Sequence, residues 1–284
     1  MANESQPAAG RRWLATVSHP IRLVRWFQKL VFRLLHSRLR HSVFIKSFLY
    51  RIVYLLPEGW RMPDGIRDTL KLVADTKKNI FFVNIGCNDG LAGNPLREFV
   101  VTRKWRGIMV EPVSYVFQRL VKAYGKFPDI HCENAAIGEI SGKKPFYYLR
   151  KNNVLPPGYD QIGSFSKDKM LNEDYLFPGL AQYIESRDFI CLTLRDLLAK
   201  HRAGYVDVYL IDAEGFDYEI IKQIDLKKNP PSLVIFETIH LSQADKTACY
   251  KLMEDAGYGL KEVLGDTLAT LPKDFAPSGG SQLA

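Results

Sequence analysis

The chain has 284 residues, of which 46% are hydrophobic and 25% are charged, with 4 cysteines and a formal charge of +8. This composition is typical of a globular protein and excludes a disordered chain, a coiled coil and a small domain stapled by disulfides. A chain of this length buries roughly three quarters of the surface that its unfolded state exposes, so a large core needs neither metal nor disulfides.

The excess positive charge lies entirely at the N-terminus. Residues 1–60 carry ten basic and two acidic side chains, a net of +8, and the rest of the chain is balanced. After a leader rich in small and polar residues, apolar residues recur at helical spacing within residues 21–56, which predicts two basic amphipathic helices. We expect their apolar faces to cap the following domain. The alternative is a peripheral contact of residues 20–56 with an anionic membrane, and nucleic acid is the least favoured partner.

The N-terminus shows neither a signal peptide nor an apolar run of the ~20 residues that a membrane-spanning helix needs. The four cysteines are far apart and form no C-x-x-C pair, which argues against a zinc knuckle or a thioredoxin-type redox motif. We therefore expect a cytoplasmic protein, with a peripheral position at the inner membrane face as the alternative.

Residues 61–284 alternate between predicted strands and helices, after a turn-rich joint at residues 57–65. Short apolar runs predict buried strands at residues 79–85, 107–111, 130–134, 206–212 and 233–237. Helices are predicted at residues 95–104, 114–124 and 216–224. This succession predicts an α/β fold with a doubly wound, mostly parallel sheet, and residues 259–271 predict a C-terminal antiparallel hairpin.

The interval between residues 134 and 206 is too long for one helix that connects two strands. It contains a predicted strand at residues 145–149, a loop rich in Pro, Gly and Asn, and a helix start with capping spacing at Thr193 and Asp196. We predict that an insert at about residues 139–200 shapes the substrate pocket of the second domain, residues 61–284.

Polar residues follow three of the predicted strands. The first strand ends in the turn Gly86-Cys87-Asn88-Asp89-Gly90, the second ends in Glu111, and a later strand ends in Asp212. Ligands of doubly wound sheets bind at these carboxyl ends. Glycines let the backbone approach a ligand, and Glu111 can accept both hydroxyls of a ribose, which predicts an adenosine-bearing cofactor. Because Asp89 stands where a dinucleotide site would hold phosphate, the turn favours the positively charged S-adenosylmethionine.

Four segments carry a resemblance to a known family, at residues 84–90, 110–112, 134–138 and 210–217. Their sequences and their order resemble the FkbM family of S-adenosylmethionine-dependent methyltransferases over roughly residues 79–240, and the D-x-E-G element from Asp212 to Gly215 is the most specific part. The resemblance implies a class I, Rossmann-like methyltransferase. It also implies methyl transfer to a hydroxyl of a glycan, a glycolipid, a lipid-linked acceptor or another small natural product.

The resemblance further implies roles for single residues. The cofactor-binding residues would be Asn84, Gly86, Asn88 and Gly90 at the methionine end, Glu111 at the ribose, Glu133, Asn134 and Ala135 at the adenine, and Asp212 at the reacting centre. The chain departs from the family pattern where Asn84, Leu210 and Asp217 replace an acid, a lysine and a glutamate.

Methyl transfer to a hydroxyl needs a general base. Asp212 is the first candidate and His240, after the following strand, is the second. We expect no metal, and the alternative is a divalent-cation site formed by Asp212, Glu237 and His240. Two other functions stay open: a catalytically silent scaffold that keeps the fold, and a nucleic-acid-binding protein that uses the basic N-terminus.

Overall fold

The computed structural model describes residues 64–91, 93–152, 154–155, 159–172 and 179–274, all within one compact unit, Met62–Ala284. The leader and the amphipathic helices predicted for residues 1–60 lie outside the described residues. Within the described part of the chain, no helix is long and apolar enough to cross a membrane.

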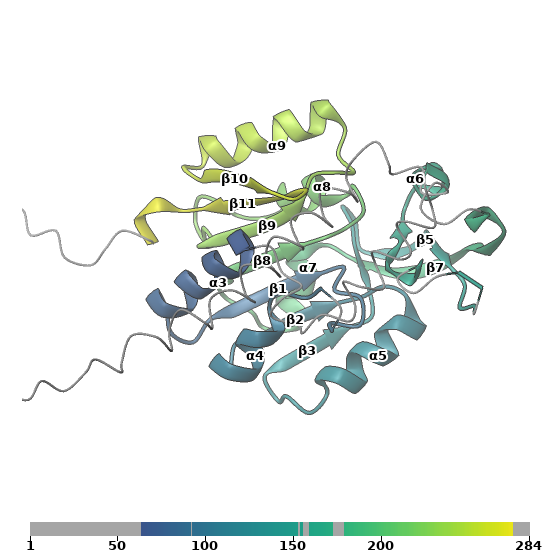
Figure 1. Ribbon diagram of the computed structural model, residues 1–284, viewed down its shortest axis with the longest axis horizontal. Coiled ribbons are helices and arrows are strands. Elements are labelled where there is room, and N and C mark those ends of the chain that lie inside the picture. The colour runs from purple at the N-terminus through teal and green to yellow at the C-terminus, as the bar shows by residue number, and fades with distance from the viewer. Residues whose placement is uncertain (1–63, 92, 153, 156–158, 173–178, 275–284) are drawn as a thin grey trace, which may run out of the picture. The chain divides into compact units, whose positions relative to one another are not determined.

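Seven strands form one sheet in the order β10-β11-β9-β8-β1-β2-β3 (Figure 1). Neighbouring strands are parallel except at β11, which is antiparallel to both β9 and β10. The strands are β1 (Phe81–Ile85), β2 (Arg106–Val110), β3 (Ile130–Glu133), β8 (Val208–Ile211), β9 (Leu233–Glu237), β10 (Gly259–Val263) and β11 (Asp266–Thr270). The predicted mostly parallel sheet with a C-terminal antiparallel hairpin is confirmed. The strand order reverses beside β1, which lies between β2 and β8.

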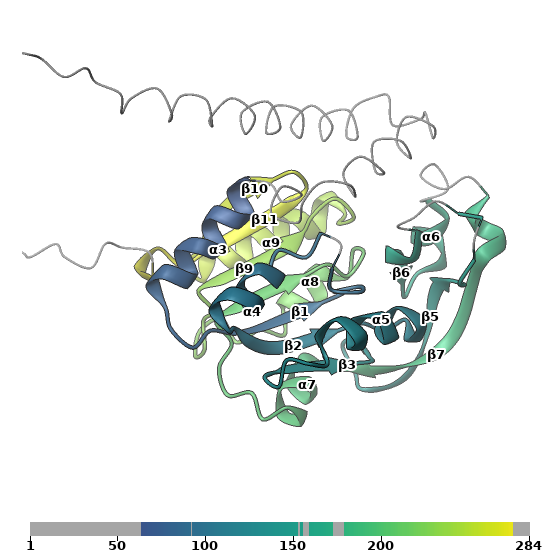
Figure 2. The same ribbon diagram turned by 60° about the horizontal axis from the view of Figure 1, so that its bottom comes forward.

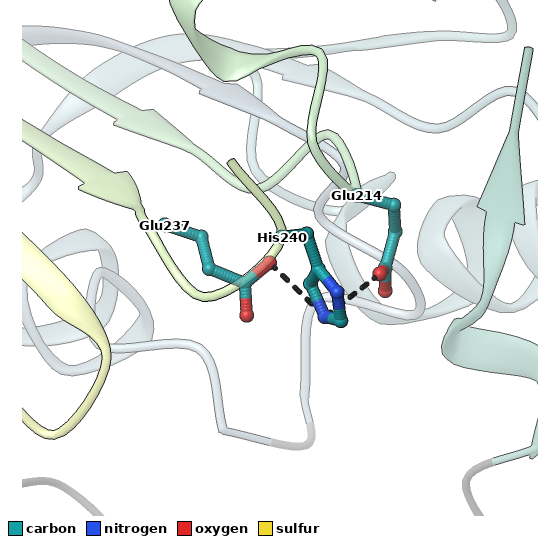
Figure 3. A group of neighbouring side chains, drawn as sticks. All are labelled: Glu214, Glu237 and His240. Carbon is teal, nitrogen blue, oxygen red and sulfur yellow. Dashed lines mark ion pairs between the residues drawn. The ribbon is translucent and has the colours of Figure 1, made fainter. Parts of the chain in front are cut away.

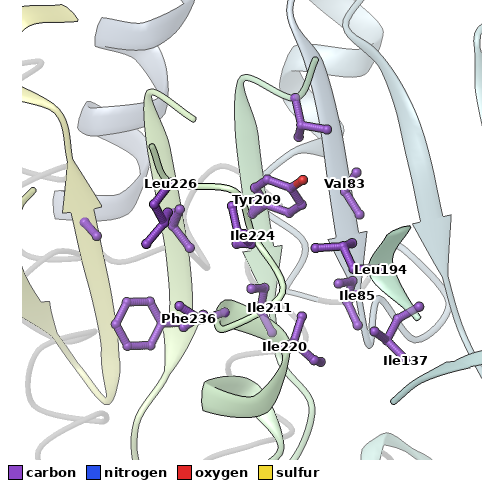
Figure 4. Close-up of a cluster of buried hydrophobic side chains, with 14 of the residues drawn as sticks. Val83, Ile85, Ile137, Leu194, Tyr209, Ile211, Ile220, Ile224, Leu226 and Phe236 are labelled. Carbon is purple, nitrogen blue, oxygen red and sulfur yellow. The ribbon is translucent and has the colours of Figure 1, made fainter. Parts of the chain in front are cut away.

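Helices cover both faces of this sheet. One face packs against α3 (Asp64–Thr76), α4 (Arg97–Arg103) and α5 (Ser114–Tyr124), and the other against α7 (Leu194–Lys200), α8 (Asp217–Ile221) and α9 (Gln243–Asp255). Figure 4 shows part of the second core, where Ile220 of α8 packs with Ile211 and Phe236 of the sheet. Because both faces are covered, the central strands are apolar on both sides, which is why they read as continuous apolar runs.

The helix α5 illustrates how sequence spacing selects the buried face. Val116, Leu120 and Tyr124 follow one another at intervals of one helical turn, and all three are buried. The polar residues between them face outward. The sequence therefore predicted both ends of this helix correctly.

A second, smaller sheet lies beyond one end of the large sheet (Figure 2). Its strand order is β4-β7-β5-β6, and β5 pairs with β7 in antiparallel fashion along the whole length of β5. Its elements are β4 (Ala136–Ile137), β5 (Gly142–Leu149), the 3-10 turn η3 (Tyr159–Gln161), β6 (Gly163–Ser164), α6 (Lys167–Asn172), the 3-10 turn η5 (Leu180–Tyr183) and β7 (Ile184–Leu192). A last 3-10 turn, η6 (Pro272–Asp274), follows β11.

Candidate active site

The carboxyl ends of four adjacent parallel strands, β3, β2, β1 and β8, open onto one pocket of about 560 Å³, a volume that includes space open to solvent. The opposite wall comes from the second sheet. The pocket therefore lies at the switch point of strand order, where ligands of doubly wound sheets bind. The strand ends contribute Ile85, Gly86, Val110, Glu111, Pro112, Val113, Ala135, Asp212, Ala213 and Glu214, and the second wall contributes Phe146, Asp160, Gln161, Ile162, Gly163 and Phe165.

The turn after β1 needs glycine for steric reasons. Gly86 has a φ of 73°, and a Cβ atom there would overlap the carbonyl oxygen of Asp212. Gly90 also has a positive φ, of 70°. A side chain is excluded there by helix α5, because a Cβ atom would overlap the ring of Tyr124. The Tyr124 hydroxyl donates a hydrogen bond of 2.6 Å to the carbonyl of Gly90. Gly86 thus lies on the pocket wall, and Gly90 anchors the turn to α5.

Glu111 is a buried carboxylate at the end of β2, with 5% of its surface exposed. Its two oxygens accept backbone hydrogen bonds from the amides of Asn88, at 3.0 Å, and Val113, at 2.8 Å. Burial raises the pKa of Glu111 to about 8, although both backbone donors oppose that shift. Each oxygen keeps a second lone pair, so Glu111 can accept further hydrogen bonds from a ligand in the pocket.

Two of the predicted asparagines turn their side chains away from this pocket. Asn84 is buried, with 2% of its surface exposed, and its amide donates to the side chain of Asn94 at 3.4 Å. The Asn134 amide donates to the carbonyls of Glu111 and Pro112, at 2.8 Å each, and so fixes the loop that carries Glu111. Neither lines the pocket. Their proposed contacts with the cofactor stay predictions.

The residues expected at the adenine are divided between two places. Ala135 lines the pocket. The Glu133 carboxylate instead contacts the C-terminal end of α7. It lies 2.8 Å from Nζ of Lys200, the last residue of the helix, and 2.9 Å from Nε2 of His201, the next residue. Asn88 is also outside the pocket lining, and its side-chain amide donates to the carbonyl of Asp160 at 3.0 Å.

Asp212 directly follows β8 and faces the pocket, where solvent reaches its side chain. The protein walls around the pocket still desolvate the carboxylate and raise its pKa to about 6. Asp217 lies behind it and is fully buried. Its carboxylate accepts backbone hydrogen bonds from Ala213, Gly215 and Glu237, at 3.2–3.4 Å. Asp217 therefore holds the D-x-E-G turn against the end of β9.

His240 lies between two glutamates from different strand ends (Figure 3). Its Nε2 is 3.3 Å from Glu214 and 3.7 Å from Glu237. Burial and the charge of Lys169 lower the pKa of His240, while burial and neighbouring carboxylates raise the pKa of Glu237 well above its usual range. Both directions favour the neutral forms near pH 7, so His240 is able to accept a proton.

One ligand atom from each of Glu214, Glu237 and His240 lies within 4.8 Å of the other two, a spacing that a divalent cation could bridge. This group differs from the cation site considered from sequence, because Glu214 stands in place of Asp212. The position of the Glu214 side chain in this group depends on the turn after β8, where the Glu214 backbone has a φ of 50°.

Sequence reasoning proposed that an insert at about residues 139–200 shapes the pocket, but it did not identify which of its residues form the second wall. Phe146 and Phe165 line it, and their rings are 5.1 Å apart at the centroids, with Phe216 a further 5.2 Å from Phe165. Asp160 and Gln161 are polar members of this wall. Among the aromatic residues of the insert, no local pattern separates those in the pocket from those in the core, because the strand pairing that places them is long-range.

This strand order, with a reversal beside β1 and one antiparallel strand near the end of the sheet, is that of the Rossmann-like class I methyltransferases, as predicted. The sequence profile of the methyltransferase FkbM domain matches residues 84–260. The chain therefore belongs to the FkbM family of S-adenosylmethionine-dependent methyltransferases, and the resemblance seen in its motifs is confirmed.

Several solved structures are similar to this chain. The FkbM methyltransferase of Methylobacillus flagellatus KT is 14% identical, with a TM-score of 0.41, and the match covers 68% of this chain and 43% of that one. The fibrillarin of Aeropyrum pernix, with natively bound S-adenosyl-L-methionine, is 11% identical, with a TM-score of 0.34 and coverage of 71% and 73%. The N-terminal domain of human METTL16 in complex with SAH is 11% identical, with a TM-score of 0.36 and coverage of 71% and 67%. No curated protein matches the chain.

Proposed function

We propose that the protein transfers a methyl group from S-adenosylmethionine to a hydroxyl oxygen of a glycan, a glycolipid or another natural product. The observation that carries the proposal is the charge of the pocket wall. Among the described residues that line the pocket, four are acidic (Glu111, Asp160, Asp212 and Glu214), and none is Lys, Arg or His. Because its pKa is raised to about 8, Glu111 adds little of the negative charge near pH 7, and that charge comes from Asp160, Asp212 and Glu214. Such a wall repels phosphate and suits a ligand with a positive sulfonium and a positive ammonium.

The residues of the pocket fit this cofactor. Glu111 has lone pairs left for two ribose hydroxyls after accepting its two backbone hydrogen bonds. Ala135 and Val113 offer an apolar surface for a base. Gly86 brings bare backbone to the wall beside Asp212, where the methionine end would lie. When bound, S-adenosylmethionine supplies a methyl group on a positively charged sulfur.

Asp212 is the first candidate for the general base. It faces the pocket, and its raised pKa of about 6 makes it a better proton acceptor than an ordinary aspartate while it is still ionised at pH 7. Asp212 would take the proton of the acceptor hydroxyl as the oxygen bonds to the methyl carbon and the carbon–sulfur bond breaks. His240 is the second candidate. It does not line the pocket itself, but its Nε2 lies 3.3 Å from Glu214, which does.

Cofactor binding and methyl transfer test the proposal separately. Isothermal titration calorimetry should show binding of S-adenosylmethionine and S-adenosylhomocysteine, and labelled methyl groups should appear on hydroxyl acceptors. Asp212→Asn should bind the cofactor and lower kcat by roughly 10²–10⁴-fold. The exposed Asp129, before β3, provides the matched control Asp129→Asn. Full activity of Asp212→Asn with loss in His240→Gln would transfer the role of the base to His240, and cofactor binding without turnover on any acceptor would favour the silent scaffold.

A further inference from the structure

The wall opposite the strand ends contains a short segment, residues 159–163, that polar contacts connect to the large sheet. Asp160, Gln161, Ile162 and Gly163 all line the pocket. Tyr159 and Ile162 also contribute to a small apolar cluster of their own. The distance of this segment from the strand ends sets how tightly a ligand in the pocket is enclosed.

Asp160 connects this segment to helix α5 and to the turn after β1. Its carboxylate pairs with Arg119 of α5, with Oδ2 at 2.6 Å from Nη2. The Asp160 side chain is 9% exposed, whereas that of Arg119 is 45% exposed. Its carbonyl accepts the side-chain amide of Asn88, in the turn after β1, at 3.0 Å.

These contacts continue to the carboxylate proposed to bind the ribose. The backbone amide of Asn88 donates to Glu111 at 3.0 Å. A path of three polar contacts therefore runs from Arg119 on the surface of α5, through Asp160 and Asn88, to Glu111. The Arg119 guanidinium also lies 6.0 Å from the centre of the Tyr115 ring, which limits where it can go if Asp160 is lost.

We propose that Arg119 is a positioning residue for cofactor binding. By pairing with Asp160, Arg119 holds segment 159–163 over the pocket. The inference rests on the proposed function, because it takes the ligand to be S-adenosylmethionine. Arg119 does not line the pocket and touches no reacting atom. Arg119 therefore affects the affinity of the pocket for its ligand, and other residues carry out the chemical step.

The sign of the effect separates positioning from simple electrostatics. Arg119→Ala removes a positive charge near a positively charged ligand, and Asp160→Asn removes a negative one. A purely electrostatic effect would therefore tighten binding in the first variant and weaken it in the second. A positioning effect weakens binding in both, and the double variant is no worse than either single one, since all three lose the same contact.

Calorimetric titration of the full chain with S-adenosylmethionine and S-adenosylhomocysteine tests this. We expect Arg119→Ala and Asp160→Asn each to raise the Kd roughly tenfold, as is typical for loss of a partly buried ion pair, and Arg119→Lys to recover most of the affinity. The KM for the cofactor should rise with little change in kcat. Arg103→Ala is the matched control, because Arg103 pairs with Asp75 at 2.9 Å on α3 and lines no pocket.

The wild type and the variants fail in different ways if the proposed function or the role of Arg119 is wrong. If the wild-type chain binds no S-adenosylmethionine, the proposed function fails and the inference fails with it. If the wild type binds but Arg119→Ala binds equally well, or more tightly while Asp160→Asn binds more weakly, only the inference is overturned. Thermal unfolding of each variant checks folding, and if Arg119→Ala does not fold, Arg119→Gln takes its place, because it also removes the positive charge but keeps most of the side chain.

Discussion

Gly86 and Asp212, on neighbouring strand ends, approach each other so closely that no side chain fits between them. We predict that Gly86→Ala destabilises the fold by at least about 2 kcal/mol, because alanine at positive φ is strained and its Cβ would displace the backbone of Asp212. Gly204→Ala should change the stability by less than about 0.5 kcal/mol, since nothing lies within 4 Å of a Cβ there. Urea denaturation measures both, and equal stabilities would show that the two strand ends can separate without cost.

Glu111 predicts a pH dependence of stability. Its folded pKa of about 8 lies above the ordinary 4.5, so the folded state keeps a proton that the unfolded state releases between these values. Glu111 therefore stabilises the fold fully below about pH 4.5, and this contribution is lost as the pH rises to about 8, with a slope of up to about 1.4 kcal/mol per pH unit.

Urea titrations of the cofactor-free wild type and of Glu111→Gln at several pH values between 5 and 8.5 test this sign. Glutamine forfeits part of the hydrogen bonding to Asn88 and Val113 at every pH, so only the change with pH is informative. The stability of the wild type relative to the variant should fall as the pH rises. A difference that stays constant, or grows, would mean that the two backbone donors keep Glu111 ionised.

At this scale the sequence could identify residues whose position follows from the ends of strands. Gly86, Glu111, Ala135 and Asp212 meet on one pocket wall because the carboxyl ends of parallel strands lie together. It could not identify Asp160. That side chain reaches the pocket only through contacts with residues far away in the sequence, and no local pattern marks them.

At the scale of elements, helix α7 connects the second sheet to β8 and begins at a side-chain cap. The Thr193 hydroxyl accepts the backbone amide of Asp196 at 3.0 Å. We predict that Thr193→Ala lowers the stability by about 1 kcal/mol, the usual cost of a lost cap, and leaves the Kd for S-adenosylmethionine unchanged. Thr102→Ala, whose hydroxyl contacts a carbonyl within α4, is the control and should be nearly neutral. Thermal unfolding and calorimetry separate the two effects, and weakened cofactor binding in Thr193→Ala would connect α7 to the pocket.

The same scale shows which elements a local pattern can predict. The bounds of α5 and β9 were predicted correctly, because α5 has a strong apolar periodicity and β9 is a continuous apolar run. It did not predict α9, in which only Cys249 and Met253 are buried, so its apolar pattern is weak. The helix α3 was missed beside the Pro- and Gly-rich joint. The pairing of β5 with β7 also needed the structure, since long-range pairing depends on the closure of the insert and not on either strand alone.

At the scale of the whole molecule, the charge is divided between the N-terminal residues 1–60, with a net of +8, and a balanced remainder. A catalytic domain without net charge gains no attraction to an anionic surface, so any such attraction must come from the N-terminal residues. As the alternative to capping of the domain, we propose that residues 20–56 contact an anionic membrane peripherally. The full chain should float with vesicles containing phosphatidylglycerol and not with neutral vesicles, and flotation should decrease with salt.

A variant of the full chain with Arg22, Arg25, Lys29 and Arg33 replaced by glutamine should lose most of this flotation, because each basic residue near the surface contributes about 1 kcal/mol. The control replaces four exposed lysines of the body, Lys71, Lys122, Lys126 and Lys228, and so removes the same charge elsewhere. Equal loss in both variants would mean that net charge alone drives the association. If the unaltered full chain does not float with anionic vesicles but binds DNA or RNA in a salt-dependent manner, the basic N-terminus is instead assigned to nucleic acid. Cofactor binding should be the same in both variants, because the pocket lies wholly within residues 85–220.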